Sequence, residues 1–339
     1  VGLERTSCIR SICCRSRCCK SIRHYLCFAG SVDTDIDTFL TALDSKATDQ
    51  EKAEELAKAT PKATISASET VGRTLNTISG IISTRQSRVR GFSSGDKAFT
   101  DRNVWIKPYV SYASQSNKDN IKGFSANTKG FAIGVDGESD TFKRIGVAFS
   151  YATSDVDTND ITQTSDIESY SLIIYGSQPI IDSKANISYQ SRSWSSSLLI
   201  QADLAQAMTT AADYNSKLYF IQAVIDRNIN IKDNMSFTPM IKASYRYFDV
   251  PSYSESGAGG MNLDVQSYNT SEQNSWCRGA FMYTLNSSIN FIVSGNIDYD
   301  FKNDAPIVSS GLVGGGGIIF ETEGIENSPY IYRGGAICE

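Results

Sequence analysis

Cysteine thiolates bind zinc and form disulfides, so the cysteines of this sequence are its first candidates for chemistry. Six of the eight lie within the first 27 residues: Cys8, Cys13, Cys14, Cys18, Cys19 and Cys27. They include no Cys-x-x-Cys, and their spacing is not that of a common zinc site. A metal-binding or redox-active cysteine cluster and a small disulfide-bonded structure remain open as alternatives. The sequence favours a third interpretation, in which residues 1–32 are an anomalous Cys/Arg-rich segment read out of frame with the rest.

Catalytic groups are scarce in the remaining sequence. His24 is the only histidine and lies in the anomalous segment, so the body of the chain offers no histidine-based triad. The Asp and Glu residues are scattered over alternating patterns, which is typical of loop and lumen charges rather than of an acid–base pair. The stretch GLVGGGGIIF lacks both the G-x-G-x-x-G order and a P-loop lysine. We therefore predict no enzyme, no cofactor and no metal site.

Charge and hydropathy narrow the class of protein further. Residues 1–27 carry a net charge of +5, so the remainder carries −10. An acidic body is a poor nucleic-acid binder, because phosphate contacts need clustered cations. The mean hydropathy is −0.25, and no run reaches the roughly 18 apolar residues of a membrane helix. Membrane β-strands remain compatible with this composition, since they hide their apolar face by alternation. The basic start is also no signal peptide, because no apolar run follows it.

Two helices are expected before the strands begin. Residues 33–59 have helical spacing, and Pro61 ends that pattern. Residues 66–90 form the second helix, in which one apolar stripe is surrounded by Ser, Thr, Asn and Arg. Its 25 residues would extend about 37 Å, enough to cross a bilayer. Because its polar side chains forbid contact with lipid, this helix can cross a membrane only inside a wet lumen.

Strand patterns fill the sequence from Asn103 to Phe320. In KRIGVAFSYATSD, residues 143–155, Ile145, Val147 and Phe149 alternate with very small residues. About ten such runs of about ten residues predict an all-β antiparallel transmembrane barrel. Residues 190–212 and 309–320 fit this pattern poorly. Bulky apolar residues would face lipid, and small residues would leave room for the helix inside. The lipid-facing set is Phe131, Ile133, Val135, Ile145, Val147, Phe149, Phe291, Val293 and Ile297.

Several stretches, in this order along the chain, resemble the autotransporter (type V secretion) translocator β-domain. They are NTISGIISTRQSRVRGFSSGD, NVWIKPYVSYASQ, GFSANTKGFAIGVDGE, IGVAFSYATSDV, FTPMIKASYRYFDVPSYSESGAGGMNLDVQSYN and IYRGGA. The sequence is most similar to the surface-antigen, outer-membrane-protein-B-like branch. The resemblance implies a 12-stranded barrel in the cell outer membrane, with a helix through its lumen. It also implies a pore that exports and anchors an N-terminal passenger.

The resemblance further implies domains, site residues and partners. Residues 33–65 would be a helical linker or passenger remnant, 66–95 the luminal helix, and 96–339 the barrel. Luminal contacts would come from Leu75, Asn76, Ile78, Arg85 and Arg88. Interfacial aromatic girdles would contain Trp105, Tyr109, Tyr112, Tyr151, Tyr170 and Tyr299. Partners would be outer-membrane lipid, the barrel-assembly machinery and a covalently linked passenger.

Three departures from the family qualify these expectations. The linker has Arg73-Thr74-Leu75-Asn76 where some members cut themselves at an Asn-Asn pair, so autocleavage is not carried over. A long β-rich passenger is absent, and the sequence ends at YRGGAICE without the family's terminal aromatic residue. We therefore expect about ten to eleven strands and a truncated or non-functional copy. The alternatives are a simple outer-membrane channel or structural barrel, and a soluble all-β adhesin fragment.

Overall fold

The computed structural model describes most of the chain. The described residues are 34–88, 104–118, 121–137, 144–179, 185–204, 208–286, 289–302, 305–317, 319–326 and 328–338. The predictions for the Cys/Arg-rich segment at residues 1–32 lie outside these residues.

Three helices precede the strands: α2 (Thr34–Asp44), α3 (Asp49–Lys58) and α4 (Lys62–Arg88). The single helix expected over residues 33–59 is therefore wrong, because a capping box at Thr48 starts a second helix. The Glu51 amide donates to Thr48 Oγ1 at 3.2 Å, and the Thr48 amide donates to Glu51 Oε2 at 2.9 Å. Helix α4 begins directly after Pro61, four residues before the predicted start at residue 66. Among the described helices, none has both the length and the apolar composition of a membrane-spanning helix.

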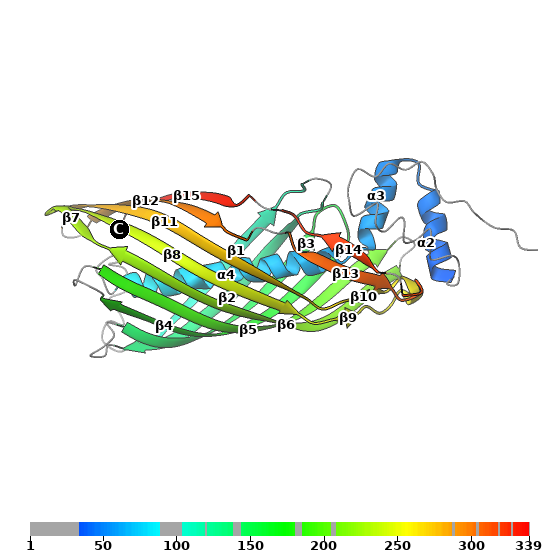
Figure 1. Cartoon of the computed structure of the whole chain (residues 1–339), viewed down its shortest axis with the longest axis horizontal. Helices are drawn as coiled ribbons and strands as arrows, with labels where there is room; N and C mark the ends of the chain where they lie inside the picture. Colours follow the sequence, from blue (N-terminus) through cyan, green and yellow to red (C-terminus); the bar gives the residue numbers. More distant parts are fainter. Residues whose placement is uncertain are drawn as a thin grey trace, which may run out of the picture.

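Most of the strands form one large antiparallel sheet that curves around α4 (Figure 1). Its order is β1–β2–β3–β4–β5–β6–β8–β11–β12–β15, and β7 pairs with β8. The bounds are β1 Val104–Gln115, β2 Phe124–Gly137, β3 Arg144–Thr158, β4 Gln163–Pro179, β5 Ala185–Leu204, β6 Met208–Arg227, β7 Ile229–Lys232, β8 Met235–Val250, β11 Tyr268–Asn286, β12 Ile289–Asp300 and β15 Tyr330–Cys338. These 11 strands agree with the ten to eleven expected. Within the described residues, no ladder joins β1 to β15.

Two parts of the sheet differ from the sequence pattern. Residues 190–212, where alternation is weak, belong mostly to β5 and β6, which pair along their whole length. The polar composition of residues 153–166 is typical of a long loop, yet only residues 159–162 separate β3 from β4. The Asp, Thr and Ser residues on either side of 159–162 belong to the paired parts of β3 and β4. Backbone pairing therefore extends beyond the apolar part of these strands.

A second, smaller sheet lies beside α2 at one end of the molecule (Figure 1). Its order is β14–β13–β10–β9. The bounds are β9 Tyr253–Ser254, β10 Leu263–Val265, β13 Ile307–Leu312 and β14 Phe320–Glu323, and a 3₁₀ turn, η2, spans Gly259–Met261. The glycine-rich stretch 309–320 thus belongs to this small sheet and not to the large one.

The two faces of the large sheet are reversed relative to a soluble protein. On β3, the side chains of Ile145, Val147 and Phe149 are exposed, while Ala148 and Ser150 are buried. Successive side chains of a strand leave opposite faces, so the exposed set forms an outer apolar surface and the buried set faces α4. Soluble proteins rarely expose so much contiguous apolar surface, which argues against a soluble adhesin fragment.

Candidate functional site: helix α4 and the inner wall

Helix α4 packs mainly against the inner faces of β1 to β5. Its apolar stripe contains Leu75 and Ile78, whose exposed fractions are both 0%. Burying each side chain stabilises the packed helix by about 1.5–3 kcal/mol. The wall opposite this stripe is built of small residues such as Ala132, Ala148 and Ala152, all of them buried. Small side chains let the helix axis approach the sheet closely, which explains the unusual composition of the inner face.

A polar network fixes the C-terminal half of α4. Arg85 donates to both carboxylate oxygens of Asp136, from Nε at 2.9 Å and from Nη2 at 3.2 Å. The Tyr175 hydroxyl donates to Asp136 Oδ2 at 2.6 Å, and Trp105 Nε1 donates to the Tyr175 oxygen at 2.9 Å. The side chain of Asp136 has an exposed fraction of 0%. A carboxylate with no access to water needs such compensation, so this network ties the helix to β1, β2 and β4.

Two glycines make room for the network. A Cβ atom at Gly134 would lie 2.7 Å from the Trp105 ring, and one at Gly146 would lie 2.7 Å from Tyr175 Cζ. Both distances are shorter than van der Waals contact. The inner face of β2 and β3 therefore needs glycine where the aromatic rings of β1 and β4 cross it.

Further hydrogen bonds run along the helix. Ser79 Oγ donates to Gln222 Oε1 at 3.2 Å, and Gln86 Nε2 donates to the Gly176 carbonyl at 2.7 Å. At the N-terminus of α4, Gln163 Oε1 accepts from the Ala63 amide at 3.1 Å. The first amides of a helix have no partner within it, so Gln163 acts as a cap supplied by the wall. The helix is thus held at both ends and in the middle.

The structure places the predicted luminal residues as follows. Leu75 and Ile78 are buried against the wall, and Arg85 joins the polar network. Asn76 lies on the exposed side of the helix. Arg88 belongs to α4, but its side chain is outside the described residues.

Sequence reasoning missed the partners of α4 on the wall, chiefly Asp136, Tyr175 and Gln163. Asp136 carried a readable signal, since it is a lone carboxylate among small inward-facing residues of GFAIGVDG. Gln163 carried none, because it lies in the polar stretch 153–166, whose composition is that of a loop.

All nine residues of the predicted lipid-facing set lie on the outer face. Their exposed fractions range from 37% for Phe131 to 58% for Val293. Tyr112, Tyr151, Tyr170 and Tyr299 also lie on this face. Tyr151 contacts Tyr170 and Phe131 at centroid distances of 5.1 and 6.2 Å.

Trp105 and Tyr109 are corrections to the predicted aromatic girdles. Both point inward: Trp105 binds Tyr175, and the Tyr109 hydroxyl lies 3.1 Å from Ser150 Oγ. The reason is strand parity, since Ile106, Val110 and Tyr112 occupy the outer face of β1. Because both faces of β1 carry bulky residues, the sequence alone could not assign them.

Three comparisons with known proteins bear on this arrangement. A model of the autotransporter beta-domain family matches residues 104–336. Outer membrane protein B of Rickettsia prowazekii (strain Madrid E) is 27% identical over 184 residues, which are 52% of this chain and 11% of that protein. Outer membrane protein A of Rickettsia conorii (strain ATCC VR-613 / Malish 7) is 27% identical over 240 residues, 66% of this chain and 12% of that protein. The chain thus spans about a tenth of the length of these relatives.

Among solved structures, the fold is similar to the translocator domain of the autotransporter NalP from Neisseria meningitidis. The TM-score is 0.53 at 11% identity, and the match covers 78% of this chain and 96% of that one. At this identity the likeness concerns the fold alone.

Proposed function

This chain belongs to the autotransporter beta-domain family, and we propose that it is the translocator that exports an N-terminal passenger and anchors it. As a member of that family it lies in the cell outer membrane. The passenger would lie N-terminal to α4 and be covalently linked to the sheet through that helix.

One observation carries this proposal: a polar helix lies inside the sheet and is bonded to its inner wall. Helix α4 has 27 residues, enough to run through the membrane-embedded height of the sheet. Partly buried Arg85 and fully buried Asp136 bond inside, while the outer face is aliphatic. A polypeptide held in the lumen with its N-terminal side at one opening is the expected state after export.

The connections between strands support an orientation. Residues 251–267 and 301–329 are long connections, and they lie at the end of the sheet where α4 begins (Figure 1). Only residues 287–288 separate β11 from β12 at the opposite end. Outer-membrane barrels have short periplasmic turns and longer extracellular loops. We therefore place α2, α3 and the start of α4 outside the cell, and the C-terminus of α4 on the periplasmic side.

The outer face supports lipid as a partner. Toward the end of the sheet where α4 begins, the outer faces of β3 and β4 change from aliphatic residues to Tyr151 and Tyr170 and then to exposed Asp157 and Asp166. Tyrosine prefers the boundary between hydrocarbon and headgroups. We place the outer boundary of the membrane at this pair, continued by Tyr112 and Tyr299. Insertion by the barrel-assembly machinery is the corresponding proposal for assembly, and it rests on family membership.

Exposure of the N-terminus tests the proposal. The full chain is produced in a Gram-negative host with an export leader and an epitope tag before residue 1, and intact cells are treated with protease. We expect loss of the tag, because the N-terminal side of α4 lies outside. A control chain with the tag between Asp233 and Asn234, at the opposite end of the sheet, keeps its tag until the outer membrane is opened. If the N-terminal tag survives in intact cells while the protein shows heat-modifiable gel mobility, the export proposal is wrong and a simple channel remains.

A further inference from the structure

The two long connections fold together into one structure. The connection after β8 contributes β9, η2 and β10, and the connection after β12 contributes β13 and β14. Strands β10 and β13 pair from Leu263↔Leu312 to Val265↔Ser310. Beyond that ladder, the Gly314 amide donates to the Gly260 carbonyl at 2.9 Å. These segments are far apart in the sequence, and they meet at the end of the large sheet where α4 begins (Figure 1).

Helix α2 is seated on this small sheet. The Gly260 amide donates to Asp35 Oδ2 at 2.9 Å, and Ile36 and Phe39 are buried. Gly259 has φ +55°, and a Cβ atom there would lie 2.0 Å from Asp35 Oδ2. Both the backbone conformation and the close approach of α2 therefore require glycine at this position. The contact between α2 and the small sheet is therefore specific, since it combines a hydrogen bond with buried apolar side chains.

The junction between α3 and α4 is held at the same end. Gln163 Nε2 donates to the carbonyls of Lys58 and Thr60, each at 2.9 Å. Lys62 Nζ donates to the Glu323 carbonyl of β14 at 2.5 Å. Residues 58–62 are thus bonded on one side to the large sheet and on the other to the small sheet.

The connection between β1 and β2 reaches the same structure. Lys118 Nζ donates to the Glu326 carbonyl at 2.6 Å, where Glu326 lies between β14 and β15. This contact bridges the two strands of the large sheet that form no ladder with each other. At this end, the connection after β1 is therefore bonded to the segment before β15.

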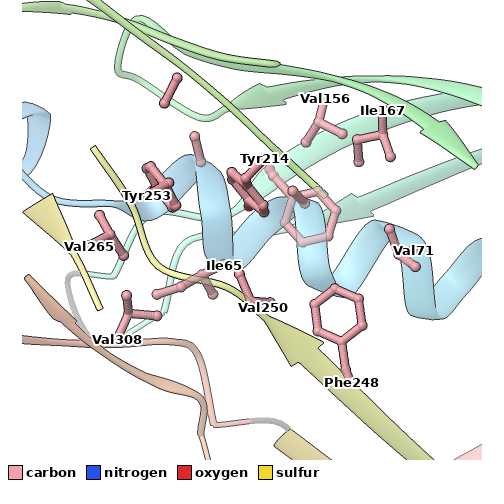
Figure 2. Close-up of a cluster of buried hydrophobic side chains, with 14 of the residues drawn as sticks. Ile65, Val71, Val156, Ile167, Tyr214, Phe248, Val250, Tyr253, Val265 and Val308 are labelled. Atoms are coloured by element: carbon pink, nitrogen blue, oxygen red, sulfur yellow. The ribbon is translucent and has the colours of Figure 1, made fainter. Parts of the chain in front are cut away.

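Apolar side chains fill the space that these segments enclose (Figure 2). They come from both connections, from β6 and β8, and from α4, and none is more than 8% exposed: Ile65, Tyr214, Val250, Tyr253, Val265 and Val308. The rings of Tyr214 and Tyr253 are stacked at 4.5 Å. Apolar constrictions close pores because water leaves them.

Helix α4 alone does not fill the lumen. It packs mainly on β1 to β5, and inward-facing Lys242, Ser244 and Arg278 on β8 and β11 are only half-buried. Water can reach this side of the lumen. The apolar layer at the outer end is the place where that passage is interrupted.

We infer that residues 34–64 and the two long connections form an outer cap, which seals the pore independently of the helix inside it. The inference rests on the proposed export function. Because part of the cap is the exported chain itself, the seal is complete only after residues 34–64 have passed through. The cap then resists both leakage and backward movement of the chain.

Adjacent residues of β13 provide the test. Val308 points into the apolar layer with an exposed fraction of 0%, whereas Ile307 has an exposed fraction of 49%. In Val308→Asp a buried carboxylate would open the layer to water, and Ile307→Asp would leave it intact. The full chain and both variants are refolded, checked by heat-modifiable gel mobility, and inserted into planar bilayers. We expect several-fold higher conductance for Val308→Asp than for the wild type, and no change for Ile307→Asp.

Two results would overturn the cap. One is equal, low conductance in both variants. The other is a wild type that already conducts as strongly as Val308→Asp. The N-terminal tag assay on the same variants keeps this failure separate from failure of export, since surface exposure of the tag does not depend on the seal.

If Val308→Asp does not refold, Asp35→Ala replaces it, with Asp37→Ala as the control on the exposed side of α2. We then expect higher conductance and faster hydrogen exchange at the Gly260 amide for Asp35→Ala alone. Unchanged conductance in both would overturn the cap.

Discussion

The ion pair between Arg85 and Asp136 should dominate the attachment of α4 to the wall. Replacing Arg85 by Ala leaves a carboxylate whose side chain is 0% exposed and which still accepts a hydrogen bond from Tyr175. Breaking a buried pair in this way costs about 3–5 kcal/mol. Since the Tyr175 bond is retained, we expect the lower part of that range, about 3 kcal/mol.

The reverse change is expected to cost less. In Asp136→Ala the arginine keeps some access to water, because its side chain is 18% exposed. We expect a loss of about 1–2 kcal/mol. The double variant removes both charges and should cost less than the two single changes together. The expected coupling energy is about 2 kcal/mol.

Urea unfolding in phospholipid vesicles measures these energies, with tryptophan fluorescence as the signal. Arg73→Ala is the control, because Arg73 lies on the same helix with its side chain 42% exposed, pairs with Glu69 at 3.9 Å and donates to Gln115. Since the guanidinium of Arg73 is largely in water, we expect its loss to cost about 1 kcal/mol. A coupling energy below about 0.5 kcal/mol would refute the idea that this pair fixes the helix.

Three further predictions concern packing, pH and membrane contact. Gly134→Val should destabilise the protein by about 1–3 kcal/mol in the same urea assay, since its side chain would collide with the Trp105 ring. Burial raises the pKa of Glu55, but hydrogen bonds from two lysines outweigh it, so the pKa is lowered from 4.5. A lowered carboxyl pKa in the folded state means that stability is present above pH 4.5 and is lost as pH falls through the folded pKa. The wild-type protein should therefore lose helical structure in α2 and α3 as the pH falls below 4.5, whereas the stability of Glu55→Gln should depend less on pH in this range. Circular dichroism during acid titration measures this difference. Ile174→Lys should cost about 2–4 kcal/mol of folding free energy in vesicles, because Ile174 lies on the outer face of β4, four residues deeper than Tyr170 and nearer the membrane centre. A soluble protein would tolerate this change at an exposed position, so no loss of stability would contradict the membrane assignment.

The fold class was predictable because the membrane imposes a simple pattern. A side-chain period of two forces Val147 and Phe149 to share a face, and lipid requires that face to be apolar along its whole span. The luminal helix was predictable for a similar reason, since its Ser- and Thr-rich surface is too polar for lipid. Both inferences depend on periodicity within one segment, which a single sequence contains in full.

Local signals that compete with a stronger pattern were harder to use. The helical pattern runs through Thr48 without a break, yet Thr48 and Glu51 are the two ends of a capping box, which starts α3 anew. In β1 the bulky residues occur on both faces, so parity had no apolar contrast from which to start. Trp105 and Tyr109 were misassigned for that reason.

Contacts between distant segments could not be predicted in this way. Arg85 and Asp136 are 51 residues apart, and nothing in either neighbourhood identifies the other. The pairing of β10 with β13 depends on where β8, β11 and β12 place the ends of their connections. The large sheet must exist before these two connections can meet, and α2 can find its seat only after they have met. Residues 34–64 therefore look like an unremarkable helical linker in the sequence, because their partners in the cap lie some 200 or more positions downstream. The contact between Asp35 and Gly260, with a separation of 225 residues, is an example.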